Sequence, residues 1–291
     1  MTATNALARL TDQPALDTIA NPLSRTVRAT YEAGGTAGQQ VKNALHGVWL
    51  RHPLHPVFTD IPVGAWTTAL VLDGVAARRG DESMSQAADV AIAVGLAGAA
   101  GAAITGLTDW SETDGQARRT GLIHGLLNIA ATSLFAAGLI LRRRGDRSTG
   151  TSCAAAGYAI ALGSAWLGGD LVYDQRVGVT HATTGEPETF TAIANSADVP
   201  EGSMRRVQHG DLDLLVVRQH GQLCALAHSC AHLGGPLSEG TLKVGSIVCP
   251  WHGSEFRLDD GRVINGPATQ NQPCLEVREQ AGRIEVKRRR N

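Results

Sequence analysis

The chain has 291 residues, enough for two domains, and a formal net charge of −1, which leaves no basic excess for a nucleic-acid surface. Its five cysteines are too few for a disulfide framework. The mean hydropathy of −0.06 averages two different halves. Residues 57–175 are rich in Ala, Gly, Leu and Val, whereas residues 186–291 have the composition of a soluble β domain.

Four apolar stretches lie in the first half, at residues 57–77, 90–107, 120–141 and 148–169. Each is close to the ~20 residues that an α-helix needs to cross the hydrocarbon core of a bilayer. The alternative is an Ala/Gly-rich soluble bundle, which would carry charges along one face of each helix. Because the last three stretches carry no charge, the pattern predicts a four-helix transmembrane bundle.

The first half also shows signs of an internal repeat. The sequence RRGD occurs at residues 78–81 and 143–146, and the helix before each copy is expected to have a histidine near its start, His55 or His124. If all four helices span the membrane, these histidines lie near the same membrane face. Polar groups at membrane depth are costly, and histidine is an axial ligand of haem. His55 and His124 are therefore candidates for a haem, metal or quinone site, and the alternative is that they cap or cross-link helices.

Three motifs in this region stand out: HPLHP at residues 52–56, TGLTDW at 105–110 and GGDLVYDQRVGV at 168–179. With them, residues 45–180 resemble a four-helix bacterial membrane domain of unknown function that is marked by His-Pro-Leu-His-Pro. The resemblance implies four spans and supplies no activity.

Two Cys–His pairs lie in the second half, Cys230-Ala-His232 and Cys249-Pro-Trp-His252. A [2Fe–2S] cluster of the mixed type binds two thiolates on one iron and two imidazoles on the other, so each of two loops must supply one Cys and one His. Zinc is the alternative, although structural zinc sites more often contain a C-x-x-C knuckle. The neighbouring residues Leu233, Trp251 and Ser254 are candidates for placing backbone N–H groups or a hydroxyl near the cluster sulfurs.

With these motifs, residues 188–288 resemble the Rieske iron–sulfur family. The resemblance implies that Cys230 and Cys249 bind one iron, and that His232 and His252 bind the other. In the respiratory branch each loop has a further cysteine, and the two form a disulfide; the corresponding residues here are Gly235 and Trp251. The tyrosine that is common in that branch is here Phe256. These departures favour the ferredoxin-like branch, which serves oxygenases and reductases. They predict a reduction potential below that of a quinol-oxidising Rieske protein of the respiratory branch.

Alternating segments at residues 212–227 and 278–288 predict hairpins of a small antiparallel domain. The sequence thus predicts an α+β multidomain protein, in which a four-helix transmembrane bundle precedes a small antiparallel β Rieske domain. The expected parts are a polar N-terminal segment (1–44), the transmembrane domain (45–180), a linker (181–187) and the Rieske domain (188–291).

The function predicted from the sequence is a multi-pass cell-membrane protein that carries single electrons through its Rieske cluster. One alternative is a membrane oxidoreductase that pairs the cluster with haem or quinone near His55 and His124, and another is a redox sensor. The roughly forty residues after His252 leave no room for a mononuclear-iron oxygenase domain. The expected partners are the lipid bilayer and a reductase, an oxygenase or a respiratory component. The balance of basic residues slightly favours RRGD loops in the cytoplasm and a Rieske domain on the outer side. The lack of the disulfide cysteines and the assembly of such clusters inside the cell favour the opposite side, and we expect a cytoplasmic Rieske domain.

Overall fold

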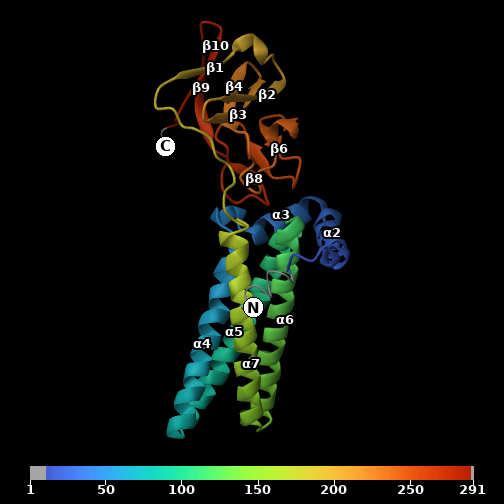
Figure 1. Cartoon of the computed structure of the whole chain (residues 1–291), viewed down its shortest axis with the longest axis vertical. Helices are drawn as coiled ribbons and strands as arrows, with labels where there is room; N and C mark the ends of the chain where they lie inside the picture. Colours follow the sequence, from blue (N-terminus) through green and yellow to red (C-terminus); the bar gives the residue numbers. More distant parts are fainter. Residues whose placement is uncertain (1–10, 290–291) are drawn as a thin grey trace. The chain divides into compact units, whose positions relative to one another are not determined.

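The computed structural model describes residues 11–289, and the chain divides into two compact units. The first unit contains the residues up to Gly38 together with Pro53–Val177, and the second contains Gln39–His52 together with the residues from Gly178 onward. Helices make up the first unit, and strands dominate the second (Figure 1). The α+β fold class is therefore confirmed, whereas the domain boundaries that the sequence suggests stay a prediction.

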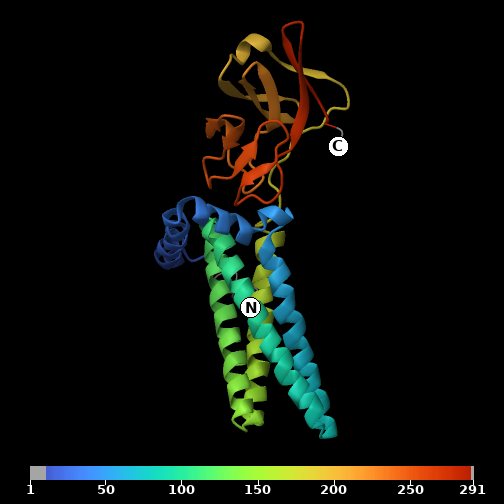
Figure 2. The same ribbon diagram turned by 180° about the vertical axis from the view of Figure 1, so that it is seen from behind.

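Four long helices form the body of the first unit, and they run side by side in both views (Figures 1 and 2). They are α4 (Leu54–Arg79), α5 (Glu82–Ser111), α6 (Gly115–Arg143) and α7 (Arg147–Tyr173). The pairs α4–α5 and α6–α7 pack closely as hairpins. Between them Trp66 stacks on Phe135 with ring centroids 4.0 Å apart, in a buried cluster that also contains Ile92. A Cβ at Gly95 would lie 2.2 Å from the indole nitrogen of Trp66, so this close packing requires a glycine.

The two RRGD segments form the turns of the two hairpins, and their last residues serve as helix caps. Helix α4 ends at Arg79 and is followed by Gly80, whose φ of 64° suits a glycine. The Asp81 carboxylate then accepts the N–H groups of Ser83 and Met84, and the Asp146 carboxylate accepts that of Thr149. Aspartate is a favoured N-cap because it satisfies N–H groups that have no partner inside the helix.

Asp73, which interrupts the first apolar stretch, is buried in an ion-pair network close to these turns. Its carboxylate contacts Arg142 at 2.5 Å, and Arg142 also contacts Asp89 at 3.1 Å. Arg147 contacts Asp89 at 2.6 Å. A buried charge is tolerated when it is paired in this way, and removing one partner would leave the other charge uncompensated.

The expectation of four transmembrane helices is supported only in part. Within residues 11–289, two helices, α5 and α6, are long and apolar enough to cross a membrane. Helix α4 contains Asp60 and Asp73, and α7 is only mildly apolar. The four spans therefore remain a proposal.

Six α-helices precede the β domain in the described part of the chain, two more than the sequence predicted. The additional helices are α2 (Asp17–Ala33) and α3 (Gly35–His46), in the segment that we expected to be only polar. Helix α2 is held by an ion pair between Asp17 and Arg119 at 3.0 Å and by a hydrogen bond between the Tyr31 and Thr108 hydroxyls at 2.7 Å. These partners are distant in sequence, which explains why local patterns did not reveal the helix.

The second unit contains two antiparallel sheets. The six-stranded sheet has the order β1-β10-β9-β4-β3-β2, and the four-stranded sheet has the order β5-β6-β7-β8. Their strands are β1 (Thr191–Asn195), β2 (Ser203–His209), β3 (Leu212–Gln219), β4 (Gln222–Ala227), β5 (Thr241–Lys243), β6 (Ser246–Val248), β7 (Glu255–Arg257), β8 (Val263–Asn265), β9 (Cys274–Gln280) and β10 (Arg283–Lys287). The two predicted hairpins are present as β3–β4 and β9–β10.

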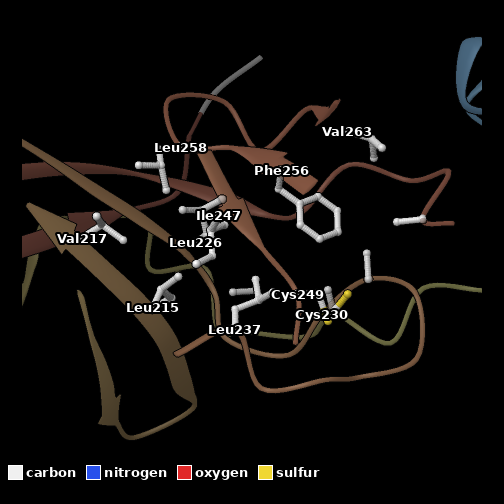
Figure 3. Packing of buried hydrophobic residues seen from close by; sticks show 14 residues of the cluster. Leu215, Val217, Leu226, Cys230, Leu237, Ile247, Cys249, Phe256, Leu258 and Val263 are labelled. Atoms are coloured by element: carbon white, nitrogen blue, oxygen red, sulfur yellow. The ribbon is translucent and has the colours of Figure 1, made fainter. Parts of the chain in front are cut away.

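A buried cluster joins the two sheets to the cysteines of the two Cys–His motifs. Leu226 from the larger sheet, Ile247 and Phe256 from the smaller sheet, and both Cys230 and Cys249 belong to it (Figure 3). The two loops that contain these cysteines therefore rest on the hydrophobic core, which fixes their backbone.

Candidate metal centre

Two loops with the same backbone design carry the Cys–His motifs. In the first, the N–H of Cys230 donates to the carbonyl of Gly235 at 2.8 Å, and the N–H of Gly234 donates to the carbonyl of Cys230 at 2.8 Å. In the second, the N–H of Cys249 donates to the carbonyl of Ser254 at 2.8 Å, and the N–H of Gly253 returns to Cys249 at 3.2 Å. Gly234 and Gly253 have φ of 78° and 74°, a conformation that glycine adopts without strain.

The two cysteine side chains meet at the base of these loops (Figure 3). Both are buried, with 1% and 3% of Cys230 and Cys249 exposed. A hydrogen bond between the thiols raises the pKa of Cys230 and lowers the pKa of Cys249 to about 7. Backbone N–H groups also donate to the sulfurs, those of His232 and Leu233 to Cys230, and those of Trp251 and His252 to Cys249. Such donors stabilise negative charge on sulfur.

The two histidines form a second pair beside the cysteines. The rings of His232 and His252 have centroids 5.0 Å apart and are nearly perpendicular, at 83°. Burial lowers the pKa of His232 well below its usual value, so the imidazole is neutral, as a metal ligand must be. The buried Nδ1 of His232 has no hydrogen-bond partner among residues 11–289.

This arrangement matches the ligand requirements of a [2Fe–2S] cluster, which binds sulfur ligands and imidazole ligands as separate pairs. Within the described part of the chain, no three His, Cys, Asp or Glu side chains converge as they would around a single ion. A two-iron cluster does not need such a convergence, because each iron takes two protein ligands.

Three further residues named from the sequence lie in these loops. Leu233 and Trp251 contribute the backbone N–H groups described above. The Trp251 side chain is 56% exposed and covers Gly235, where a Cβ would lie 3.1 Å from the indole ring and 2.8 Å from the sulfur of Cys249. Ser254 is fully buried, and its hydroxyl accepts the N–H of Ala268 at 3.0 Å, which leaves the hydroxyl proton for another acceptor.

Gln272 supports the first loop and was not predicted from the sequence. Its amide donates to the carbonyls of Ala227 and Ser229, both at 2.7 Å, and accepts the N–H of Ala231 at 2.9 Å. The side chain is almost entirely buried. A single glutamine outside both motifs gives no local signal, so only the tertiary structure reveals this contact.

A short segment of the second unit, residues 39–52, also contacts the end of β8 and the residue that follows it. Asn43 donates to the side chain of Asn265 at 2.9 Å and accepts the N–H of Gly266 at 3.0 Å. Val48 packs against the buried cluster that contains the two cysteines. The sequence reasoning missed this contribution because it assigned these residues to the N-terminal segment and the helical domain.

In the first unit, the structure brings the other two candidate residues together. The ring centroids of His55 and His124 are 6.4 Å apart, although the residues lie on different helices. They form a second, separate candidate site.

Comparisons with known proteins agree with both halves of the chain. Residues 189–276 match the Rieske [2Fe-2S] domain, and residues 51–181 match a family described as a predicted membrane protein, DUF2231. Ferredoxin CarAc of Metapseudomonas resinovorans is 34% identical over 100 residues, which cover 34% of this chain and 94% of that protein. Apoptosis-inducing factor 3 of Homo sapiens is 32% identical over 96 residues, which cover 33% of this chain but only 16% of that protein.

Among solved structures, a ferredoxin-containing complex is similar to part of this chain. It is described as the complex of reduced oxygenase and oxidized ferredoxin in carbazole 1,9a-dioxygenase, and its matching chain is 30% identical. The match covers 35% of this chain and 97% of that chain, with a TM-score of 0.33.

The Rieske-type ferredoxin relatives function in electron transfer, and the [2Fe–2S] cofactor expected from the sequence is confirmed. The membrane character is indicated by the DUF2231 match and by the two apolar helices. The chain therefore belongs to the Rieske [2Fe–2S] family through its C-terminal domain, and it carries an N-terminal domain of the predicted membrane protein family DUF2231.

Proposed function

We propose that this protein is a membrane-anchored electron carrier, in which Cys230 and Cys249 bind one iron of the cluster and His232 and His252 bind the other. The observation that carries the proposal is the pair of matching loops, which present two thiols and two imidazoles as separate pairs. A [2Fe–2S] cluster takes up and releases one electron at a time, so the expected activity is single-electron transfer between redox partners.

The edge of the site formed by His252 and Trp251 is where we expect partners to dock. His252 is partly exposed, and the Trp251 side chain is 56% exposed. An exposed imidazole ligand gives the electron a short path to a docked protein. Two ferredoxin relatives are described as components of dioxygenases, and we propose a reductase, an oxygenase or a respiratory component as the partner here.

The potential of the cluster is expected in the lower part of the Rieske range, which extends from about −150 to +300 mV. Hydrogen bonds to sulfur raise the potential. Phe256 has no hydroxyl to donate, and Gly235 and Trp251 cannot form the disulfide of the respiratory branch. A redox titration that placed the midpoint in the upper half of this range would refute the assignment to a ferredoxin-like carrier.

We further propose that all four helices α4–α7 span the membrane and that the Rieske domain lies on the cytoplasmic side. Two of these helices meet the length and composition requirements. Labelling single introduced cysteines in intact cells with an impermeant reagent would test the side: a label at exposed Val244 should require cell lysis.

The ligand assignment can be tested on the full chain in detergent. The wild type should show the electron paramagnetic resonance signal of a reduced Rieske cluster, and Cys249→Ser or His252→Ala should lose it. Cys224→Ser is the matched control, because Cys224 is a free cysteine outside both loops and should leave the signal unchanged. Zinc in place of iron, or a full signal in Cys249→Ser, would refute the assignment.

The carrier role has its own test. A flavin-dependent ferredoxin reductase with NADH should reduce the cluster rapidly, and an added acceptor protein should reoxidise it. The sensor alternative predicts instead a change of oligomeric state with the redox state of the cluster. The oxidoreductase alternative requires a second redox centre in the helices.

A further inference from the structure

His55 lies in a recess between the first two long helices. Its Nδ1 is 2.9 Å from the carbonyl oxygen of Ala102 on α5. The ring rests on Gly106, where a Cβ would lie 2.7 Å from Cε1 of the imidazole. The carbonyl and the glycine are four residues apart on one helix and therefore share a face. Any side chain at position 106 would close this recess.

His124 has the same surroundings between the other two helices. Its Nδ1 is 2.8 Å from the carbonyl oxygen of Ser164 on α7. The ring rests on Gly168, where a Cβ would lie 3.2 Å from Cε1. The glycine again follows the carbonyl by four residues. The α4–α5 and α6–α7 hairpins thus contain the same arrangement of histidine, carbonyl and glycine. The internal repeat suggested by the sequence is therefore also present in the structure.

The hydrogen bonds of the two imidazoles determine which ring nitrogen could bind a metal. A carbonyl oxygen can only accept, so Nδ1 of each imidazole carries the proton and the lone pair lies on Nε2. The Asn128 amide nitrogen lies 3.1 Å from Nε2 of His124, which agrees with an accepting Nε2. An N–H donated to a carbonyl is the usual way in which a protein orients a metal-binding histidine.

The spacing of the rings suits one metal between them. Metal–imidazole bonds are about 2 Å long, so two imidazoles on opposite sides of one metal have centroids roughly 6 Å apart once the rings are included. The observed separation is 6.4 Å, and the ring planes are nearly perpendicular, at 86°. The two matched recesses therefore present two imidazoles at the spacing of trans ligands.

We propose that His55 and His124 are the two axial ligands of a haem in the helical unit. The porphyrin of a haem supplies four equatorial nitrogens, so the iron requires only one or two ligands from the protein. The two matched histidines can supply both. A quinone would need hydrogen-bond donors for its carbonyl oxygens, and Nε2 of neither imidazole can donate in this tautomer. On haem binding, the Asn128 amide leaves Nε2 of His124. The site is independent of the Rieske cluster and of the carrier role.

The test is a titration of the purified full chain in detergent with free haemin, followed by visible and electron paramagnetic resonance spectra. The expected product is a single low-spin haem per chain that does not bind carbon monoxide, because both axial positions are filled. His55→Ala and His124→Ala should each lose the haem or convert it to a high-spin form that binds carbon monoxide. His52→Ala, which changes an exposed histidine before α4, should behave as the wild type.

Two further variants distinguish the loss of a haem ligand from a failure to fold. His55→Met should retain a six-coordinate haem with a changed spectrum and a higher midpoint potential, since thioether ligands raise the potential. Asn128→Ala should bind haem at least as tightly as the wild type. The proposal is overturned if haemin does not bind, if both alanine variants bind it unchanged, or if the pair holds a metal ion without a porphyrin. A normal cluster signal in those outcomes would leave the carrier role intact.

Discussion

Removing the Gln272 side chain should destabilise the Rieske domain more than any change at an exposed glutamine. In the Gln272→Ala variant, the N–H of Ala231 and the carbonyls of Ala227 and Ser229 lose the partner described above. A buried polar group without a partner costs about 1–3 kcal/mol. Water that enters the space would replace part of the lost hydrogen bonding. We therefore expect the free energy of unfolding to fall by about 3 kcal/mol, which corresponds to one unsatisfied donor and two weakened acceptors.

The assay is urea denaturation of the full chain in detergent, followed through the visible absorbance of the cluster. With a denaturant dependence of about 1–3 kcal/mol per molar urea, the midpoint should fall by about 1–3 M. Gln222→Ala is the matched control, because Gln222 is exposed at the start of β4; surface substitutions usually change stability by less than about 0.5 kcal/mol. If Gln272→Ala and Gln222→Ala have the same midpoint, the role assigned to Gln272 is wrong.

Three further changes probe the site. Gly235→Ala should destabilise the cluster loops by about 1–3 kcal/mol, since the new Cβ would lie 2.8 Å from the sulfur of Cys249; an unchanged rate of cluster loss would contradict this. Burial lowers the pKa of His228, with partial compensation from Asp213 at 3.6 Å, so the unfolded chain binds the proton more readily and stability falls as the pH drops below about 6.5. His228→Gln should reduce that fall in pH-dependent denaturation, and an equal fall in both proteins would exclude His228 as its source. Phe256→Tyr adds a hydroxyl close to the cysteines (Figure 3) and should raise the midpoint potential, whereas a redox titration with no increase would show that the hydroxyl does not reach a cluster sulfur.

The chemistry of the cluster could be predicted from the sequence because its ligands come in two short motifs. The Cys-x-His and Cys-x-x-His spacings fix the ligand types, and the glycines at positions 234 and 253 supply the left-handed backbone that both loops need. The antiparallel hairpins followed from alternation and turn residues, which are equally local. The apolar stretches predicted the four long helices, and the DUF2231 match agrees with their membrane character.

Local sequence could not predict contacts between distant residues. Helix α2 is fixed by partners about a hundred residues away in α6, and the first cluster loop is fixed by Gln272, more than forty residues after Ala227 and Ser229. Neither contact leaves a sequence motif, because a hydrogen bond needs only one donor and one acceptor atom, and the fold decides which two atoms meet.

The sequence by itself determined which side chains can bind a cluster and which segments are helical or extended, since backbone conformation and ligand chemistry depend on neighbours in the chain. Only the tertiary structure decided how those side chains meet. It showed that His55 and His124, on different helices, lie with their ring centroids 6.4 Å apart and that each rests on a glycine of the neighbouring helix. The physical reason is that close packing selects small residues where two helices touch, and the partner of each touching residue is set by the fold and not by the adjacent sequence.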